Sequence, residues 1–239
     1  MHKWLKSLLL VALITITQQS WGKTYLVSIG ISDYPGTQND LCLPHNDAAT
    51  IQWLYNENKN ATTVLLMNNQ ATVNNVKAAM KQLFSKATIN DIVVLFFSGH
   101  GVQGSFVCYD GFLHYSDIRT LMSSCKSKSK MVFADTCYSG SFRTNGKQTG
   151  GGWHGTNVML FLSCRTNERS IERPGMTNGF FTYALQHGLR GGADTNRDRI
   201  ITAKELFNYV SAKVKQMSNN KQHPVMWGKF SNTMPVMRW

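Results

Sequence analysis

The sequence has few acidic residues, few prolines and no apolar run long enough to span a membrane. Thirteen of its 239 residues are Asp or Glu, against 25 Lys and Arg, so the formal charge is +12 at pH 7. Five prolines exclude a collagen-like chain, and a hydrophobic content of 42% excludes a disordered one. A transmembrane helix needs about 20 apolar residues, and the longest apolar run, residues 7–17, is shorter. The composition therefore indicates a globular chain with one substantial core.

Residues 1–22 have the layout of a secretory signal peptide. A basic start precedes the apolar run at 7–17, and Ser20 and Gly22 place small residues three positions and one position before a cut. We therefore expect this segment to be removed, leaving a mature chain that starts near Lys23 and is exported to the periplasm or the medium. A buried N-terminal helix is the alternative.

The excess of basic residues raises the question of an acidic partner such as nucleic acid or lipid. Most Lys and Arg residues are scattered. The one dense cluster is Lys126, Lys128 and Lys130, which has no interleaved aromatic side chains. We interpret this cluster as a solvated loop rather than a nucleic-acid site. We therefore expect no nucleic-acid partner, no membrane attachment after signal removal, and a monomer.

The five cysteines are an odd number, so at least one thiol stays unpaired within the molecule. An exported chain can form disulfides, and Cys108 with Cys125 is a pairing that the sequence leaves open. Cys164 closes a predicted strand and is interpreted as a packed thiol. The histidines form no metal-ligand cluster, so we expect no metal site and no required cofactor.

Apolar, β-branched runs alternate along the chain with stretches in which apolar residues recur at helical spacing. The runs predict strands at 23–29, 62–67, 91–97, 131–134, 157–164 and 225–230, with a hairpin at 106–113. The helices are predicted from Asn46 or Asp47 to about 59, Thr72 to about 87, Ser116 to about 124, Thr177 or Asn178 to 189, and Thr202 to about 217. This alternation implies parallel βαβ units, so we predict one α/β domain, residues 23–239, with about six strands.

Two predicted strands are apolar on both faces, which is typical of the middle of a parallel sheet. His100 follows one and Cys137 follows the other. Ligands bind beyond the carboxyl ends of such strands, so neighbouring strands would present the two side chains together. His100 then favours the Cys137 thiolate, which attacks an acyl carbon, and the imidazolium protonates the leaving amine. The backbone N–H groups of Gly101 and Cys137 form the predicted oxyanion hole.

The surroundings of this pair resemble the two signature motifs of metacaspase-type cysteine peptidases in the caspase-like superfamily. One motif is Ser98-Gly99-His100-Gly101, and the other is Asp135-Thr136-Cys137-Tyr138-Ser139-Gly140. The resemblance covers residues 24–230, with weaker matches at 29–31, 46–48 and 178–182. It implies a caspase-like three-layer α/β/α sandwich with a mostly parallel sheet, and an endopeptidase with a Cys–His dyad.

The resemblance also implies a preference for the substrate residue before the cut bond, the P1 residue. In metacaspase-like enzymes the aspartate two positions before the nucleophile lines the P1 pocket, and Asp135 matches it. Asp47 matches a second acidic residue at the first helix, and Ser98 matches a contributing serine. Two carboxylates attract Arg or Lys and repel an acidic side chain, so cleavage of proteins or peptides after Arg or Lys is implied. The alternative role for Asp47 is helix N-capping.

The glycine-rich segment 141–156 follows the nucleophile and contains Arg143 and Lys147. An enzyme that cuts after basic residues can process itself there, so we predict self-cleavage in this loop. Two departures from metacaspases are present. Tyr138 replaces a frequent histidine, and the stretch after the histidine motif is too short for an acidic calcium-binding insert.

A separate calcium signal lies at Asp194, Asn196 and Asp198, which together with Glu205 follow the oxygen-ligand spacing of an EF-hand loop. The sixth position, where that loop needs a glycine for its sharp turn, is Arg199. An Asp/Asn-rich turn before a capped helix has the same composition. We favour this structural role over calcium binding.

Two other functions fit parts of the same sequence. A catalytically silent caspase-fold scaffold would keep the fold but has no need for both His100 and Cys137. A clan CD peptidase of the legumain or gingipain type would keep the pair but choose a different P1 residue. Cleavage assays with Arg, Lys, Asn and Asp at P1 distinguish the three.

Overall fold

The computed structural model describes residues 22–136, 157–165, 170 and 175–238. The predicted nucleophile, the loop after it and the signal segment up to residue 21 lie outside the described residues. Their predicted roles therefore stay predictions.

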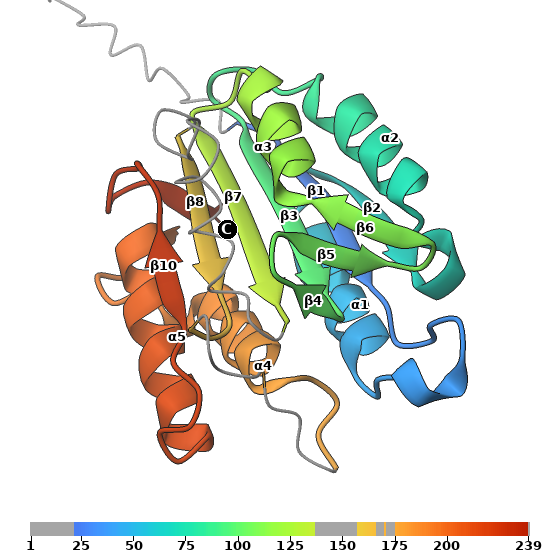
Figure 1. The fold of residues 1–239 in the computed structure, drawn as a ribbon. Helices are drawn as coiled ribbons and strands as arrows, with labels where there is room; N and C mark the ends of the chain where they lie inside the picture. Colours follow the sequence, from blue (N-terminus) through green and yellow to red (C-terminus); the bar gives the residue numbers. More distant parts are fainter. Residues whose placement is uncertain (1–21, 137–156, 166–169, 171–174, 239) are drawn as a thin grey trace, which may run out of the picture.

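A six-stranded sheet forms the centre of the molecule, in the order β10-β8-β7-β3-β1-β2 (Figure 1). All neighbouring pairs are parallel except β10 with β8. The strands are β1 (Thr24–Gly30), β2 (Ala61–Met67), β3 (Ile92–Ser98), β7 (Ser129–Asp135), β8 (Val158–Leu162) and β10 (Val225–Trp227). The prediction of six strands in a mostly parallel sheet is confirmed.

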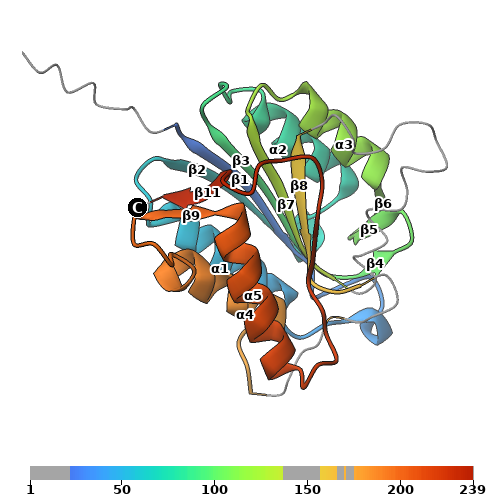
Figure 2. The ribbon, with the colours of Figure 1, turned by 90° about the vertical axis from the view of Figure 1, so that its left-hand side faces the viewer.

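Helices cover both faces of this sheet, as Figures 1 and 2 show. On one face lie α1 (Pro44–Asn56), α4 (Phe180–His187) and α5 (Ala203–Met217), and on the other lie α2 (Val73–Phe84) and α3 (Tyr115–Ser124). Alternate residues of a strand point to opposite faces. In β3, Val93 and Phe97 join the α2–α3 core while Val94 and Phe96 join the α1–α4–α5 core. The predicted three-layer α/β/α sandwich is confirmed.

Two small sheets complete the fold. The predicted hairpin is present as β5 (Ser105–Cys108) and β6 (Gly111–His114), and the short β4 (Gly101–Val102) pairs with it. In the second sheet, β9 (Ile200–Thr202) pairs with β11 (Pro235–Arg238), which the sequence did not predict. The short helical turns are η1 (Thr37–Asn39), η2 (Asn68–Gln70) and η4 (Gly188–Gly192).

Only some of the predicted helix caps are correct. Thr72 and Thr202 cap α2 and α5 through their side chains, as expected. The other predicted caps, Asn46 or Asp47, Ser116, and Thr177 or Asn178, are wrong, because the helices begin after Leu43, His114 and Gly179. Asp47 and Asn178 instead bond to each other, since Asn178 donates its amide to Asp47 at 2.9 Å. Contacts between distant segments thus override the local capping preference.

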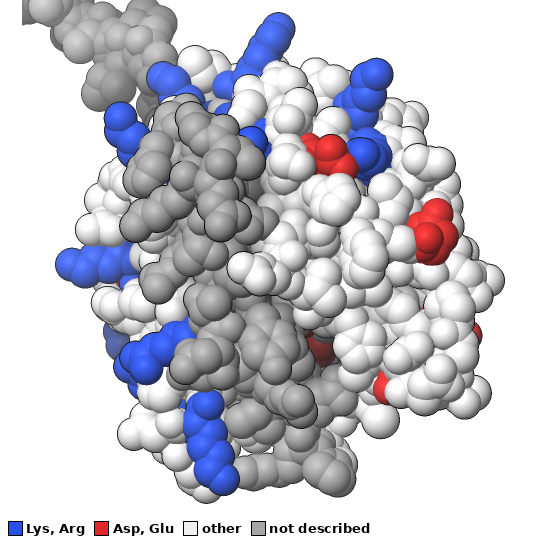
Figure 3. All heavy atoms as spheres, viewed as in Figure 1, with Lys and Arg blue, Asp and Glu red and all other residues white. Residues whose placement is uncertain are grey.

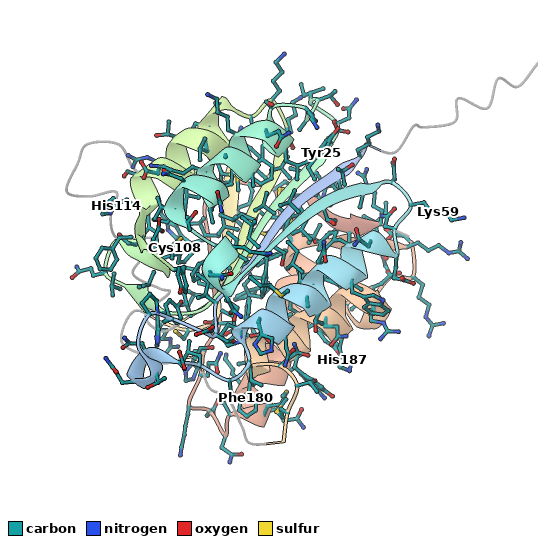
Figure 4. All side chains as sticks on the ribbon, turned by 90° about the vertical axis from the view of Figure 1, so that its right-hand side faces the viewer. Tyr25, Lys59, Cys108, His114, Phe180 and His187 are labelled. Carbon is teal, nitrogen blue, oxygen red and sulfur yellow. The ribbon has the colours of Figure 1, made fainter. Side chains whose placement is uncertain are left out.

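One prediction about a single side chain is also corrected, and one pairing that the sequence left open is decided. Lys130 is not solvated, because its stem is buried in β7 and its ammonium donates to the carbonyls of Met122 and Cys125 at the end of α3. Carbonyls at a helix C-terminus accept from a cation favourably. Cys108 and Cys125 are separate buried thiols rather than a disulfide. Cys108, labelled in Figure 4, ends β5 of the small sheet and packs in the α2–α3 core.

The surface agrees with a scattered distribution of positive charge. On the face shown in Figure 3, Lys and Arg side chains stand apart along the rim rather than in one patch. Within the part of the chain that the structure describes, no helix combines the length and the apolarity needed to cross a membrane.

Candidate active site

The register between β3 and β7 brings the two sequence motifs together. Ser98 pairs with Asp135 across these adjacent parallel strands, and the backbone N–H of Gly99 donates to the carbonyl of Asp135 at 3.3 Å. Positions 100 and 137 each lie two residues beyond this pair. Both strands end at the carboxyl edge of the sheet, where ligands bind in parallel sheets. Cys137 lies outside the described residues, but in the sequence it comes two residues after β7, the strand beside the one that leads to His100.

His100 is half-buried and is held by a backbone carbonyl. Its Nε2 lies 2.7 Å from the carbonyl oxygen of Asn39, in the turn between β1 and α1. A carbonyl can only accept, so Nε2 carries the proton and Nδ1 is left as the acceptor. This tautomer leaves one ring nitrogen able to take a proton from a nucleophile.

Tyr34 also positions His100, through a hydrogen bond to the backbone N–H of the histidine. The phenol oxygen of Tyr34 accepts from the His100 N–H at 2.9 Å and donates to the carbonyl of Val107 at 3.1 Å. The two rings lie 4.8 Å apart between centroids. A Cβ on Gly99, whose φ is +153°, would lie 2.6 Å from the Tyr34 oxygen. The close approach of Tyr34 therefore requires a glycine before His100.

Asp47 is almost completely buried beneath this edge of the sheet. Its carboxylate accepts from the Ser98 hydroxyl at 2.8 Å, the Asn178 amide at 2.9 Å and the backbone N–H of Gly179 at 3.1 Å. Burial raises the pKa of Asp47 well above its usual value, and the nearby Asp135 charge raises it further. The predicted pocket residues Asp47 and Ser98 are thus in direct contact.

Asp135, at the end of β7, is the second buried carboxylate. One oxygen accepts from the hydroxyl of Ser170, and the other accepts from the backbone N–H and the hydroxyl of Thr182, at 3.1 and 2.8 Å. Burial raises the pKa of Asp135 above its usual value, although these hydrogen bonds oppose the shift. All the donors in these bonds are neutral groups.

Gly179 lies between the two carboxylates. A Cβ at this position would lie 2.8 Å from Oδ2 of Asp135 and 3.5 Å from Oδ2 of Asp47. A side chain at residue 179 would clash with Asp135, so only glycine lets this backbone approach both carboxylates so closely. The structure therefore brings Asp47, Ser98 and Asp135, three residues from separate parts of the chain, into one cluster.

Sequence reasoning missed several residues of this site. Tyr34 and Asn39 belong to the β1–α1 turn, which carried no recognised chemistry. The segment 178–182 was noted as a weak family match without a role, and it supplies Asn178, Gly179 and Thr182 to the two carboxylates. That weak match was the one signal that could have found them.

The residue before the predicted nucleophile is firmly placed. The N–H of Thr136 donates to the hydroxyl of Ser163, which in turn donates to the carbonyl of Thr136. The thiol of Cys164 lies 3.5 Å from the same carbonyl and is fully buried. Gly101, the described part of the predicted oxyanion hole, begins β4 directly after His100.

The loop before α5 carries the interactions of a structural turn. The Asp194 carboxylate accepts from the backbone N–H groups of Asp198 and Arg199, and Glu205 accepts from Thr202 in a capping box. Arg199 adopts a φ of +64°, the left-handed conformation that a glycine favours. Over the described ranges, no group of three or more His, Cys, Asp or Glu side chains is arranged to hold a metal.

Comparison with known proteins identifies a family. The family model described as the caspase domain matches residues 24–233. A search of the curated proteins found no match to the chain.

Solved structures agree with this at the level of the fold. A protein from Geobacter sulfurreducens superposes with a TM-score of 0.70 at 17% identity, covering 90% of this chain and 97% of that one. Caspase-1 from Spodoptera frugiperda superposes with a TM-score of 0.68 at 11% identity, covering 91% and 90% of the two chains.

Proposed function

This chain belongs to the caspase domain family of cysteine peptidases, and from that premise we propose an exported, metacaspase-like endopeptidase that cleaves after Arg or Lys. Its catalytic pair is Cys137 with His100, and its substrates are proteins or peptides. The carboxylates of Asp47 and Asp135 line the P1 pocket together with Ser98.

In the proposed reaction the Cys137 thiol gives its proton to Nδ1 of His100, and the thiolate attacks the carbonyl carbon of the scissile bond. The imidazolium then protonates the leaving amine as the C–N bond breaks, which leaves a thioester on Cys137. Water hydrolyses the thioester after giving a proton to His100, and the thiol is restored. The Asn39 carbonyl supports this role, because it holds the Nε2 proton throughout.

The backbone N–H groups of Gly101 and Cys137 are proposed to stabilise the oxyanion of the tetrahedral intermediate. Each such donor contributes about 3 kcal/mol to the transition state in related chemistry. The placement of Gly101 immediately after His100 supports this assignment.

The preference for Arg or Lys rests on one observation, the pair of buried carboxylates behind the edge that carries His100. Their described donors are all neutral, so the entry of a guanidinium or ammonium group would supply the missing positive charge. An acidic P1 side chain would add a third negative charge and is therefore expected to be rejected.

Export and self-processing complete the proposal. Residues 1–22 act as the signal peptide, and cleavage after Arg143 or Lys147 matures the enzyme. Intact-mass analysis of purified protein tests the second step. A single uncut chain in a fully active sample would exclude a required internal cut.

A panel of peptides with Arg, Lys, Asn or Asp at P1 tests the proposed function. We expect kcat/KM for Arg and Lys to exceed that for Asp by at least about 100-fold, the effect of roughly 3 kcal/mol. Added calcium is expected to leave kcat/KM for the Arg and Lys peptides unchanged. Preferred cleavage after Asn or Asp would exclude the Arg/Lys proposal, and no cleavage of any peptide would favour a scaffold.

Replacement of the predicted nucleophile distinguishes catalysis by this protein from the activity of a contaminating peptidase. Cys137→Ala removes the thiol and should abolish turnover of the Arg peptide, whereas Cys42→Ala, at an exposed thiol, serves as the matched control. Retained activity in Cys137→Ala would overturn the mechanism.

A further inference from the structure

At the end of the sheet opposite the catalytic edge, Asp91 is a buried carboxylate. Only 5% of Asp91 is exposed. Its carboxylate accepts from the backbone N–H of Lys23 at 2.6 Å, from the backbone N–H of Thr88 at 2.6 Å and from the Thr88 hydroxyl at 2.8 Å. All three donors are neutral, so a buried negative charge faces only dipoles.

The described residues supply no cation to this carboxylate. Their one ion pair is between Lys77 and Asp117, and the buried Lys130 donates to the carbonyls of Met122 and Cys125 instead. The charge of Asp91 is nevertheless felt by its neighbours. Burial raises the pKa of the Tyr25 phenol, and the Asp91 charge adds to that shift.

The backbone at residues 22 and 23 passes directly over this carboxylate. A Cβ on Gly22 would lie 1.9 Å from the carbonyl oxygen of Asn90 and 2.9 Å from Cα of Asp91, so only glycine fits there. The carbonyl of Lys23 accepts from the N–H of Ile92 at 2.8 Å. Lys23 is therefore held through both its nitrogen and its carbonyl, with its nitrogen aimed at Asp91.

We propose that Asp91 is the binding site for the mature N-terminus of this protein. A signal peptidase hydrolyses the bond between Gly22 and Lys23, and water supplies the new Gly22 carboxylate and the proton of the new amine. The Lys23 α-ammonium, charged at pH 7, then forms an ion pair with Asp91. This inference rests on the export part of the proposed function.

The expected consequence is a more stable sheet after processing. An ammonium at the Lys23 nitrogen gives the buried carboxylate its missing counter-charge without moving either group. The ion pair would join the starts of β1 and β3, and β3 is the strand whose far end leads to His100. In Figure 4, Tyr25 of β1 and Phe180 of α4 lie toward opposite ends of the molecule, so this ion pair is separate from the catalytic edge.

The test compares two purified chains that differ only at the N-terminus. One begins with Lys23, and the other carries Gly-Ser-Gly before Lys23, which keeps an amide at that position. Thermal unfolding at pH 7 should give a Tm about 3 °C or more higher for the chain that begins with Lys23. Equal Tm values for the two chains would overturn the proposal.

An Asp91 variant tests whether this carboxylate is the group that binds the N-terminal ammonium. Asp91→Asn keeps an oxygen acceptor but removes the charge, and it should abolish the difference between the two N-termini. Asp33→Asn, at an exposed carboxylate, should leave that difference intact. If Asp91→Asn fails to fold, the comparison of the two wild-type chains still decides the outcome. A difference that survives in folded Asp91→Asn would exclude Asp91 as the site.

A measurement on the exported protein tests this inference independently of the proposed peptidase activity. Intact mass of the protein recovered after export should place the first residue at Lys23. A first residue elsewhere would overturn the proposed processing site, whatever the peptidase activity. If the mass and the Tm difference are as expected while no peptide is cleaved, the N-terminal site stands and the peptidase proposal fails.

Discussion

At the scale of single residues, the hydroxyl of Tyr34 makes two hydrogen bonds that connect the backbone of His100 with that of Val107 in β5. Tyr34→Phe keeps the ring against His100 but removes both bonds, each worth about 1 kcal/mol. We expect kcat for the Arg peptide to fall about tenfold, with KM changed less than about twofold, because the histidine is positioned less well.

The control for this variant is Tyr183→Phe, at a tyrosine that packs against His187 on α4. It should leave kcat unchanged. A Tyr34→Phe enzyme with normal kcat and normal pH dependence would assign the hydroxyl a purely structural role.

The carboxyl of Asp47 predicts a dependence of stability on pH. Burial and the neighbouring Asp135 raise its pKa in the folded state above the value of 3.8 that the unfolded chain has. The folded state therefore holds the proton to higher pH, and stability falls as pH rises from 3.8 through the raised pKa. The Asp47→Asn side chain cannot ionise, so the Tm of this variant should fall less than the wild-type Tm as pH rises through this range.

Thermal unfolding between pH 4 and pH 8 measures this difference. The wild-type Tm should fall relative to the Asp47→Asn Tm as pH rises, and the variant should also lose its preference for Arg at P1. Two parallel Tm curves would mean that Asp47 carries no raised pKa.

At the scale of elements, the capping box at the start of α5 is a local device that the sequence predicted. Thr202 and Glu205 exchange hydrogen bonds between side chain and backbone. Thr202→Ala removes the cap and should lower the free energy of unfolding by about 1 kcal/mol, or Tm by about 2–4 °C. Urea or thermal unfolding measures the loss.

Thr177→Ala is the matched control for that cap. Thr177 was an expected cap for α4, but α4 begins after Gly179 and Thr177 makes its side-chain bond to Asn178. This variant should change stability by less than about 0.5 kcal/mol. A loss as large as that of Thr202→Ala would mean that Thr177 supports α4 after all.

At the scale of the whole molecule, two separate cores hold the three layers together. Phe161 of β8 lies in the α1–α4–α5 core, with its ring 6.1 Å from Phe133, 5.0 Å from Phe181 and 5.7 Å from Phe207 between centroids. Phe161→Ala leaves a cavity between the sheet and two helices. It should lower the free energy of unfolding by about 3–5 kcal/mol.

Phe112→Ala is the control for this substitution, because Phe112 on β6 is 55% exposed. It should cost less than about 1 kcal/mol in denaturant unfolding. Comparable losses for the two phenylalanines would contradict the assignment of Phe161 to the structural core.

The sequence by itself determined the order of the strands and helices, the caps at Thr72 and Thr202, and the delivery of His100 from the end of an apolar strand. These features depend on residues that are consecutive or a few positions apart, so local periodicity and side-chain chemistry are sufficient to predict them. The approach of the two signature motifs also followed, because both terminate neighbouring parallel strands.

Only the tertiary structure decided the remaining contacts of the site. Tyr34 is 66 positions from His100, and Asp47 is 132 positions from Gly179. The burial of Lys130, the separation of Cys108 from Cys125 and the pairing of β11 with β9 belong to the same class. Such contacts depend on how whole layers pack, and burial then makes a hydrogen bond between distant segments worth more than a local cap. No pattern within a short stretch of sequence encodes that choice.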